Sequence, residues 1–214
     1  MHNETKPGAI KTLFLDIGGV LLTDGWGHEF RQRAVDHFKL DKKEMEDRHA
    51  MTFDTYEEGK LTLDEYLDRV IFYKPVSFSK DEFVAFMLGQ SEAFEETITF
   101  FKDLKKKYGL KVIAVSNEAR EINEYRIEKF KLNELFDAYI SSCYVHIRKP
   151  DKDMWVMACD ISQTKPEHGL YIDDRLMFAE IARGYGIHAL HFQDLDQAKE
   201  YISKLSFHTS PDKQ

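Results

Sequence analysis

Acidic and hydroxyl residues stand directly after short apolar runs of this 214-residue sequence. Asp16 follows "TLFL", Ser116 and Asn117 follow "KVIAV", and the pair Asp173 and Asp174 follows "LYI". Alone, each has an ordinary role, since a carboxylate after a strand is often a helix cap and Ser-Asn is common in turns. Together, three carboxylates in one cleft would repel each other unless positive charge stood among them. Oxygen ligands of this kind favour Mg²⁺, so the residues indicate a magnesium site if the fold brings them together.

A lysine belongs to the same set. Lys149 lies in "IRKPD", after a weaker apolar run, "AYISS". Pro150 disfavours helical backbone at Lys149 and favours an extended one, as in a loop at a strand end. A lysine placed there would offset the charge of the carboxylates.

The elements that must position these residues are strands of a parallel sheet. Continuous apolar runs separated by helical patterns are typical of such a sheet when both of its faces are covered. In an open sheet of this type, ligands bind outside the carboxyl ends of the strands, where the polar residues stand. The strands are predicted over residues 12–15, 111–115, 138–142, 170–172 and 187–192.

Helices fill the gaps of this α/β pattern. They are predicted over residues 97–108, 121–132 and 176–186, while residues 25–96 show helical periodicity and no convincing strand. Capping boxes mark two helix starts within that stretch, at Thr62 with Glu65 and at Ser79 with Glu82. We therefore expect an α/β core from residues 1–24 and 97–214, and a helical insertion over residues 25–96. Aromatic side chains are expected to form the small core of the insertion: Phe30, Phe38, Tyr66, Phe83 and Phe86.

Composition limits the partners. The net charge of -8 disfavours nucleic acid and anionic lipid as partners, and no apolar run approaches the ~20 residues of a membrane-spanning helix. The N-terminus has no apolar segment of secretory length, so a cytoplasmic location is expected. Cys143 and Cys159 lack metal-ligand spacing and are expected to be reduced thiols. The oligomeric state stays open.

The order of these motifs resembles the haloacid dehalogenase (HAD) superfamily. Asp16 in "LDIGGV", Ser116 in "VSN", Lys149 in "RKPD" and the acid pair in "YIDDR" follow its pattern over nearly the whole chain. The likeness is greatest to its subfamily I phosphatases, in which a helical cap, called C1, follows the first motif; residues 25–96 fall there. The resemblance implies a Rossmann-like parallel sheet with an inserted all-helical cap.

The resemblance also implies a Mg²⁺-dependent phosphatase. Asp16 would be the nucleophile that forms an aspartyl phosphate with a small phosphorylated metabolite, such as a sugar phosphate. Mg²⁺ would bind Asp16, the backbone carbonyl of Gly18 and Asp173, with Asp174 as a further ligand or as a partner of the ligands.

Three residues would hold the phosphate. The Ser116 hydroxyl and the Asn117 backbone N–H would bind phosphoryl oxygens, and Lys149 would act in catalysis as a point charge beside them. Positioning and charge neutralisation are most of what phosphoryl transfer requires.

Gly18 departs from the commonest form of the pattern. Most phosphatases of this superfamily carry a second aspartate there, which protonates the leaving group and activates water. Such acid–base catalysis is worth about 10²–10⁴-fold, although some members with glycine there remain active. Asp24, at the start of the insertion, is a candidate substitute, with an ordinary turn role beside Gly25 as the alternative.

Other functions stay open. A weak or inactive binding or regulatory protein could retain the fold, whereas a haloacid dehalogenase would not need the paired acids. Trp26, His28 and Arg31 fall where the cap would meet the leaving group, and plain helix packing is the alternative.

Overall fold

In the computed structural model, which describes residues 9–208, one five-stranded parallel sheet organises the chain in the order β3-β2-β1-β4-β5. Every predicted apolar run forms a strand, and the predicted α/β class with its Rossmann-like parallel sheet is confirmed. β1 is the central strand, since it pairs with β2 on one side and with β4 on the other. All four of its residues are buried. The strands are β1 (Thr12–Leu15), β2 (Lys111–Ser116), β3 (Ala138–Ser141), β4 (Gly169–Asp173) and β5 (His188–His191).

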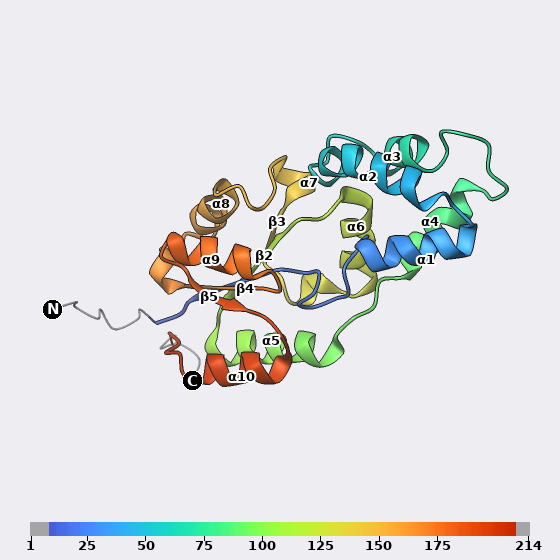
Figure 1. Cartoon of the computed structure of the whole chain (residues 1–214). Coiled ribbons are helices and arrows are strands. Elements are labelled where there is room, and N and C mark those ends of the chain that lie inside the picture. The colour runs from blue at the N-terminus through green and yellow to red at the C-terminus, as the bar shows by residue number, and fades with distance from the viewer. Residues whose placement is uncertain (1–8, 209–214) are drawn as a thin grey trace.

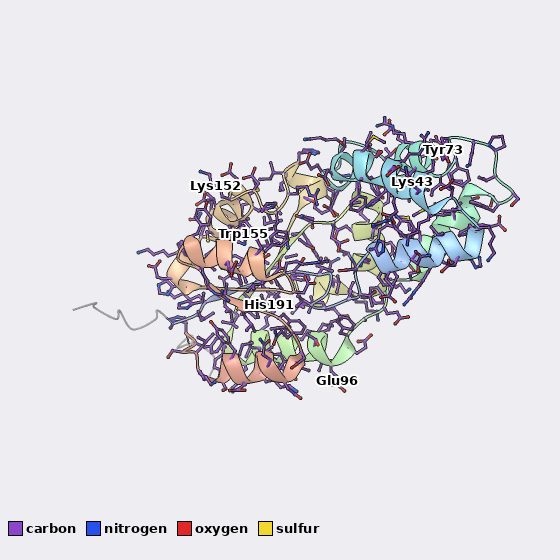
Figure 2. The ribbon with its side chains drawn as sticks, in the orientation of Figure 1. Lys43, Tyr73, Glu96, Lys152, Trp155 and His191 are labelled. Atoms are coloured by element: carbon purple, nitrogen blue, oxygen red, sulfur yellow. The ribbon has the colours of Figure 1, made fainter. Side chains whose placement is uncertain are left out.

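Helices cover both faces of the sheet (Figure 1). Leu13 and Leu15 of β1 point to one face and pack in a cluster with α5 and α10. Phe14, between them, points to the other face, where α8 and α9 cover it. Trp155 lies in that second layer (Figure 2), its ring centroid 5.8 Å from that of Tyr171 in β4. The helices of the two layers are α5 (Glu95–Tyr108), α8 (Asp153–Ser162), α9 (Leu176–Gly184) and α10 (Leu195–Ser203).

A group of four helices follows β1 and lies beside one end of the sheet (Figure 1). Both predicted capping boxes are present, Thr62 with Glu65 and Ser79 with Glu82. A separate hydrophobic cluster holds these helices together, with Phe30, Tyr66 and Phe83 buried in it and Phe38 and Phe86 packed against it. The helices are α1 (His28–Phe38), α2 (Lys42–Glu57), α3 (Leu63–Val70) and α4 (Lys80–Gly89).

Two chain segments connect the helical group to the sheet, and they run side by side. The Thr23 N–H donates to the Glu92 carbonyl at 2.9 Å, and the Phe94 N–H donates to the Leu21 carbonyl at 2.8 Å. We therefore propose residues 25–96 as the cap and residues 1–24 and 97–214 as the core, the ends of which, 1–8 and 209–214, lie outside the described residues.

The remaining elements differ in part from the prediction. α6 (Arg120–Lys129) ends before the predicted boundary at residue 132, because Lys131 adopts a left-handed conformation with φ of 51°. α8 and α10 form where no helix was predicted. The short elements are α7 (Ser142–Val145) and two 3₁₀ turns, Leu132–Glu134 and Pro166–His168. Within residues 9–208, no helix is both long and apolar enough to cross a membrane.

Candidate active site

The polar residues that end β1, β2 and β4 meet at one edge of the sheet. Asp16 directly follows β1, whereas Ser116 and Asp173 are the last residues of β2 and β4. The Ser116 hydroxyl donates to Oδ1 of Asp16 at 2.6 Å, and the Ile17 N–H donates to the same oxygen at 2.8 Å. One carboxylate oxygen of Asp16 is thus held by two donors.

Lys149 joins the acids of β1 and β4. Its Nζ lies 3.0 Å from Oδ2 of Asp16 and 2.6 Å from Oδ2 of Asp173, and its side chain is only 1% exposed. The Tyr171 hydroxyl, 3.1 Å from Nζ, also donates to Asp173. Burial lowers the pKa of Lys149, but the charges of Asp16 and Asp173 outweigh it, so the net shift is upward.

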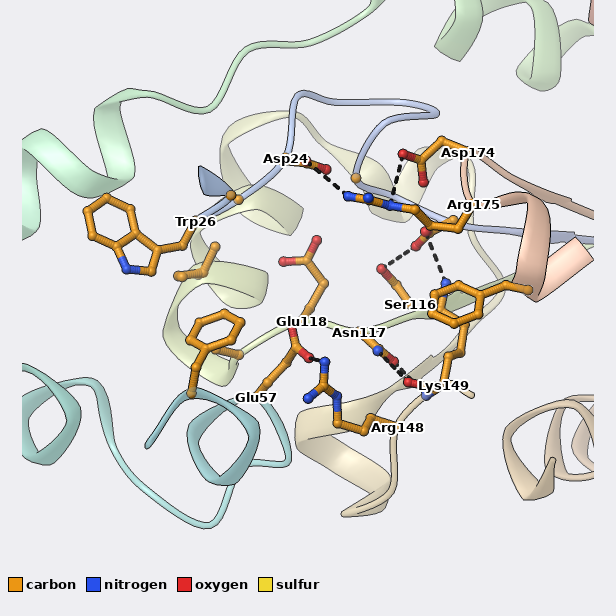
Figure 3. Close-up of a pocket in the computed structure, with 18 of the residues that line it drawn as sticks. Asp24, Trp26, Glu57, Ser116, Asn117, Glu118, Arg148, Lys149, Asp174 and Arg175 are labelled. Atoms are coloured by element: carbon orange, nitrogen blue, oxygen red, sulfur yellow. Dashed lines mark hydrogen bonds and ion pairs between the residues drawn. The ribbon is translucent and has the colours of Figure 1, made fainter. Parts of the chain in front are cut away.

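The loop that carries Lys149 is held by Asn117. The Asn117 side chain accepts a hydrogen bond from the Lys149 N–H at 2.8 Å and donates one to the Lys149 carbonyl at 3.0 Å (Figure 3). Ser116 and Asn117 therefore have different roles in this site. Ser116 contacts Asp16 directly, whereas Asn117 holds the backbone of Lys149 in place.

Asp174 completes a cluster of three acids. One carboxylate oxygen each from Asp16, Asp173 and Asp174 lies within 4.8 Å of the others. Burial is the main cause that raises the pKa of Asp16, to about 7, with Lys149 opposing it. Burial likewise raises the pKa of Asp174, although Arg175, 3.3 Å away, opposes the shift. Three carboxylates held this close keep a net negative charge beside Lys149 and Arg175, and their oxygen donors fit a divalent cation.

The glycine pair after Asp16 lets the loop approach this cluster. Gly19 adopts a φ of +71°, and a Cβ atom built there would lie 2.5 Å from Cγ of Asp174. A side chain at position 19 would therefore be strained and would displace an acid of the cluster. At Gly18, a Cβ atom would lie 3.3 Å from Oδ1 of Asp24, whose other oxygen is 3.4 Å from Arg175.

A cavity of about 580 Å³ opens above these residues, between the sheet edge and the cap. Of the three residues expected at its cap side, Trp26 and Arg31 line it. His28 is outside its lining, with a side chain 68% exposed and 3.7 Å from Glu46. Arg31 contacts Glu46 at 2.9 Å and the Trp26 carbonyl at 2.8 Å, which fixes this wall.

Three further ionisable residues line the cavity and were not predicted as site residues: Glu57, Glu118 and Arg148. Glu57, the last residue of α2, lies 2.7 Å from Arg148, and both point toward the cavity in Figure 3. Burial raises the pKa of Glu57 to about 8; the charge of Glu118 adds to the shift, and the charge of Lys149 opposes it. Glu118, also at the cavity, pairs with Arg126 of α6. Arg148 belongs to the motif "RKPD", so its place near the site could have been predicted. No sequence motif contains Glu57, because it reaches the cavity only through the packing of α2.

Comparison with known proteins adds the family. A model of haloacid dehalogenase-like hydrolases matches residues 10–186. A drimenol cyclase from Aspergillus calidoustus is 25% identical over 201 residues, which are 92% of this chain. The chain spans only 36% of the length of that curated relative.

Solved structures share the fold at low identity. An HAD family enzyme from Bacteroides thetaiotaomicron, in its magnesium complex, matches with a TM-score of 0.77 and 18% identity over 91% of this chain and 99% of that chain. The same enzyme with magnesium and inorganic phosphate gives 0.72 and 21%, over 89% and 99%. An L-2-haloacid dehalogenase from Xanthobacter autotrophicus with chloropropionic acid covalently bound gives 0.61 and 16%, over 91% and 83%. With the family match extending from β1 to α9, this chain belongs to the haloacid dehalogenase-like hydrolases.

Proposed function

We propose that this protein is a Mg²⁺-dependent phosphatase that hydrolyses a small phosphorylated metabolite through an aspartyl phosphate on Asp16. The observation that carries the proposal is the direct contact of Asp16 with both Ser116 and Lys149 at the floor of the cavity. A nucleophilic carboxylate, a hydroxyl donor and a buried cation at one point suit phosphoryl transfer.

The acid cluster supports the choice of Mg²⁺. Asp16, Asp173, Asp174 and the backbone carbonyl of Gly18 would hold the ion, and all are hard oxygen donors. Bound there, the ion would neutralise negative charge on the phosphoryl group. The dehalogenase alternative has no need of these paired acids, which favours the phosphatase.

The proposed steps use residues of this chain. A carboxylate oxygen of Asp16 attacks phosphorus, and the ester P–O bond breaks with its electron pair leaving on the alcohol oxygen, which takes a proton from Asp24 or from water. Water then attacks phosphorus and gives up a proton to the same carboxylate or to solvent. The bond between phosphorus and Asp16 breaks, its electron pair returns to the carboxylate, and inorganic phosphate leaves. The Ser116 hydroxyl and the Asn117 N–H hold phosphoryl oxygens, while Lys149 keeps its positive charge beside them.

An assay with an activated aryl phosphate tests this function. Its good leaving group reduces the need for the acid that Gly18 lacks, so turnover with Mg²⁺ is expected. Turnover should vanish in Asp16→Asn and persist in Asp103→Asn, which changes an exposed acid of α5. A folded protein that performs no better than Asp16→Asn would contradict the phosphatase and favour the binding or regulatory alternative.

A further inference from the structure

The cavity has two chemically different parts. Its floor carries the acids, Ser116 and Lys149, which would hold the phosphate. The part above the floor is lined by charged and by apolar side chains in similar number. We call its large apolar side chains the apolar rim: Trp26, Phe53, Ile122, Leu176, Met177 and Phe178. A cavity of about 580 Å³ leaves room for much more than a phosphate, so the leaving group must occupy this second part.

The ionisable groups beside the apolar rim already contact other ionisable side chains, as Arg31 does with Glu46 and Arg175 with Asp24. Glu57 lies 2.7 Å from Arg148, and Glu118 pairs with the fully buried Arg126. The Trp26 indole N–H donates to the Tyr66 hydroxyl at 2.9 Å, so it is not free to donate to a ligand. A sugar would bring hydroxyls that compete for these committed groups, and each buried hydroxyl without a partner weakens binding about tenfold.

Leu176 and Met177 provide apolar surface that the protein itself leaves uncovered. They form the first turn of α9, directly beyond Asp174 and Arg175, and are 48% and 53% exposed at the cavity. Because the same cavity holds the proposed phosphate site, a bound ester would lay its alcohol part against them. Burying apolar surface of this kind favours binding by about fourfold for each methylene group, the equivalent of ~0.8 kcal/mol.

We propose that the substrate is the phosphate monoester of a hydrocarbon or aromatic alcohol, selected by the apolar rim, and not a sugar phosphate. This inference rests on the proposed phosphatase function and names the substrate class of the same site.

A series of linear alkyl phosphates of increasing length, compared with a hexose phosphate and measured as kcat/KM with Mg²⁺, tests the inference. We expect kcat/KM to rise about fourfold per added methylene until the cavity is filled, and the hexose phosphate to be a poorer substrate. Met177→Ser and Leu176→Ser should flatten this rise. Ile161→Ser, at a position 55% exposed on α8 and outside the cavity lining, should leave it unchanged.

The outcomes separate this inference from the proposed function. Turnover with no dependence on chain length, or with the hexose phosphate preferred, would overturn the apolar rim as the selecting feature and leave the phosphatase standing. An equal loss for every substrate in Met177→Ser would also overturn it, because Met177 would then affect the phosphate site and not the binding of the alcohol part. No turnover of any ester, the aryl phosphate included, would overturn the phosphatase itself.

Discussion

A carboxylate oxygen of Asp24 lies 3.3 Å from the position that a Cβ atom would take at Gly18. A side chain at position 18 would therefore lie beside the carboxylate of Asp24, which belongs to the segment that connects the core to the cap. Arg175 holds Asp24 there at 3.4 Å and Asp174 at 3.3 Å (Figure 3). Asp24 therefore remains the candidate for assisting the leaving group.

Replacement of Asp24 should affect poor leaving groups most. An alkyl phosphate needs a proton on its leaving oxygen, whereas an activated aryl phosphate does not, so Asp24→Asn should slow the alkyl ester by about 10²-fold or more. The aryl ester should be slowed much less. Steady-state kcat for both esters measures this, with Asp103→Asn as the control, and equal effects on the two esters would rule out a role at the leaving group.

Loss of Lys149 should cost stability as well as activity. Lys149→Met removes the cation that contacts two buried acids, and breaking a buried pair from one side typically costs about 3–5 kcal/mol. Urea unfolding measures this free energy. Lys152→Met, an exposed lysine of the same loop (Figure 2), should change it by less than ~0.5 kcal/mol. If Lys149→Met lowered the free energy of unfolding as little as Lys152→Met, Lys149 would not be the cation that stabilises the two buried acids.

Glu57 should make the stability of the fold depend on pH. Its pKa is raised by burial from 4.5 in the unfolded chain to about 8, so its contribution is fully present below pH 4.5 and is lost as pH rises through 8. Unfolding free energies measured across this range should therefore fall less steeply for Glu57→Gln than for the parent protein. Glu128→Gln, an exposed control, should keep the parent slope. An unchanged slope in Glu57→Gln would mean that Arg148 keeps Glu57 ionised.

Two glycine substitutions should have opposite effects. Gly19→Ala places a Cβ atom 2.5 Å from Asp174 at a φ of +71°, so we expect a loss of at least about 1 kcal/mol and weaker Mg²⁺ binding. Gly89→Ala, at the last residue of α4 with open space around it, should be neutral or stabilising by up to ~1 kcal/mol. Thermal unfolding and calorimetric Mg²⁺ titration measure both, and a tolerated Gly19→Ala would contradict the role given to this loop.

Sequence patterns predicted the sheet well because its three central strands, β1, β2 and β4, are almost entirely buried. Each of these strands reads as a nearly continuous apolar run, and parallel strands end at the same edge, which brought Asp16, Ser116 and Asp173 together. α8 was missed because apolar residues lie on both of its sides, with Trp155 buried and Ile161 exposed, so that no helical period stands out.

The parts of the site that depend on packing could not be predicted. Tyr171 lies within a strand, where an aromatic residue indicates core, yet its hydroxyl donates to Asp173. Glu57 and Arg148 are far apart in sequence and meet only because α2 packs against α7 and the loop that follows it. Contacts of this kind follow from tertiary structure and leave no local pattern.

The most direct test of the account is to trap the intermediate on Asp16. Borohydride, added during turnover of an aryl phosphate with Mg²⁺, reduces an aspartyl phosphate to homoserine, which peptide mass spectrometry locates. If Asp16 is the nucleophile, homoserine forms at position 16, dependent on both substrate and Mg²⁺, and none forms at Asp24, Asp173 or Asp174. Sustained turnover with homoserine at another of these acids, or undiminished turnover in Asp16→Asn, would contradict Asp16 as the nucleophile.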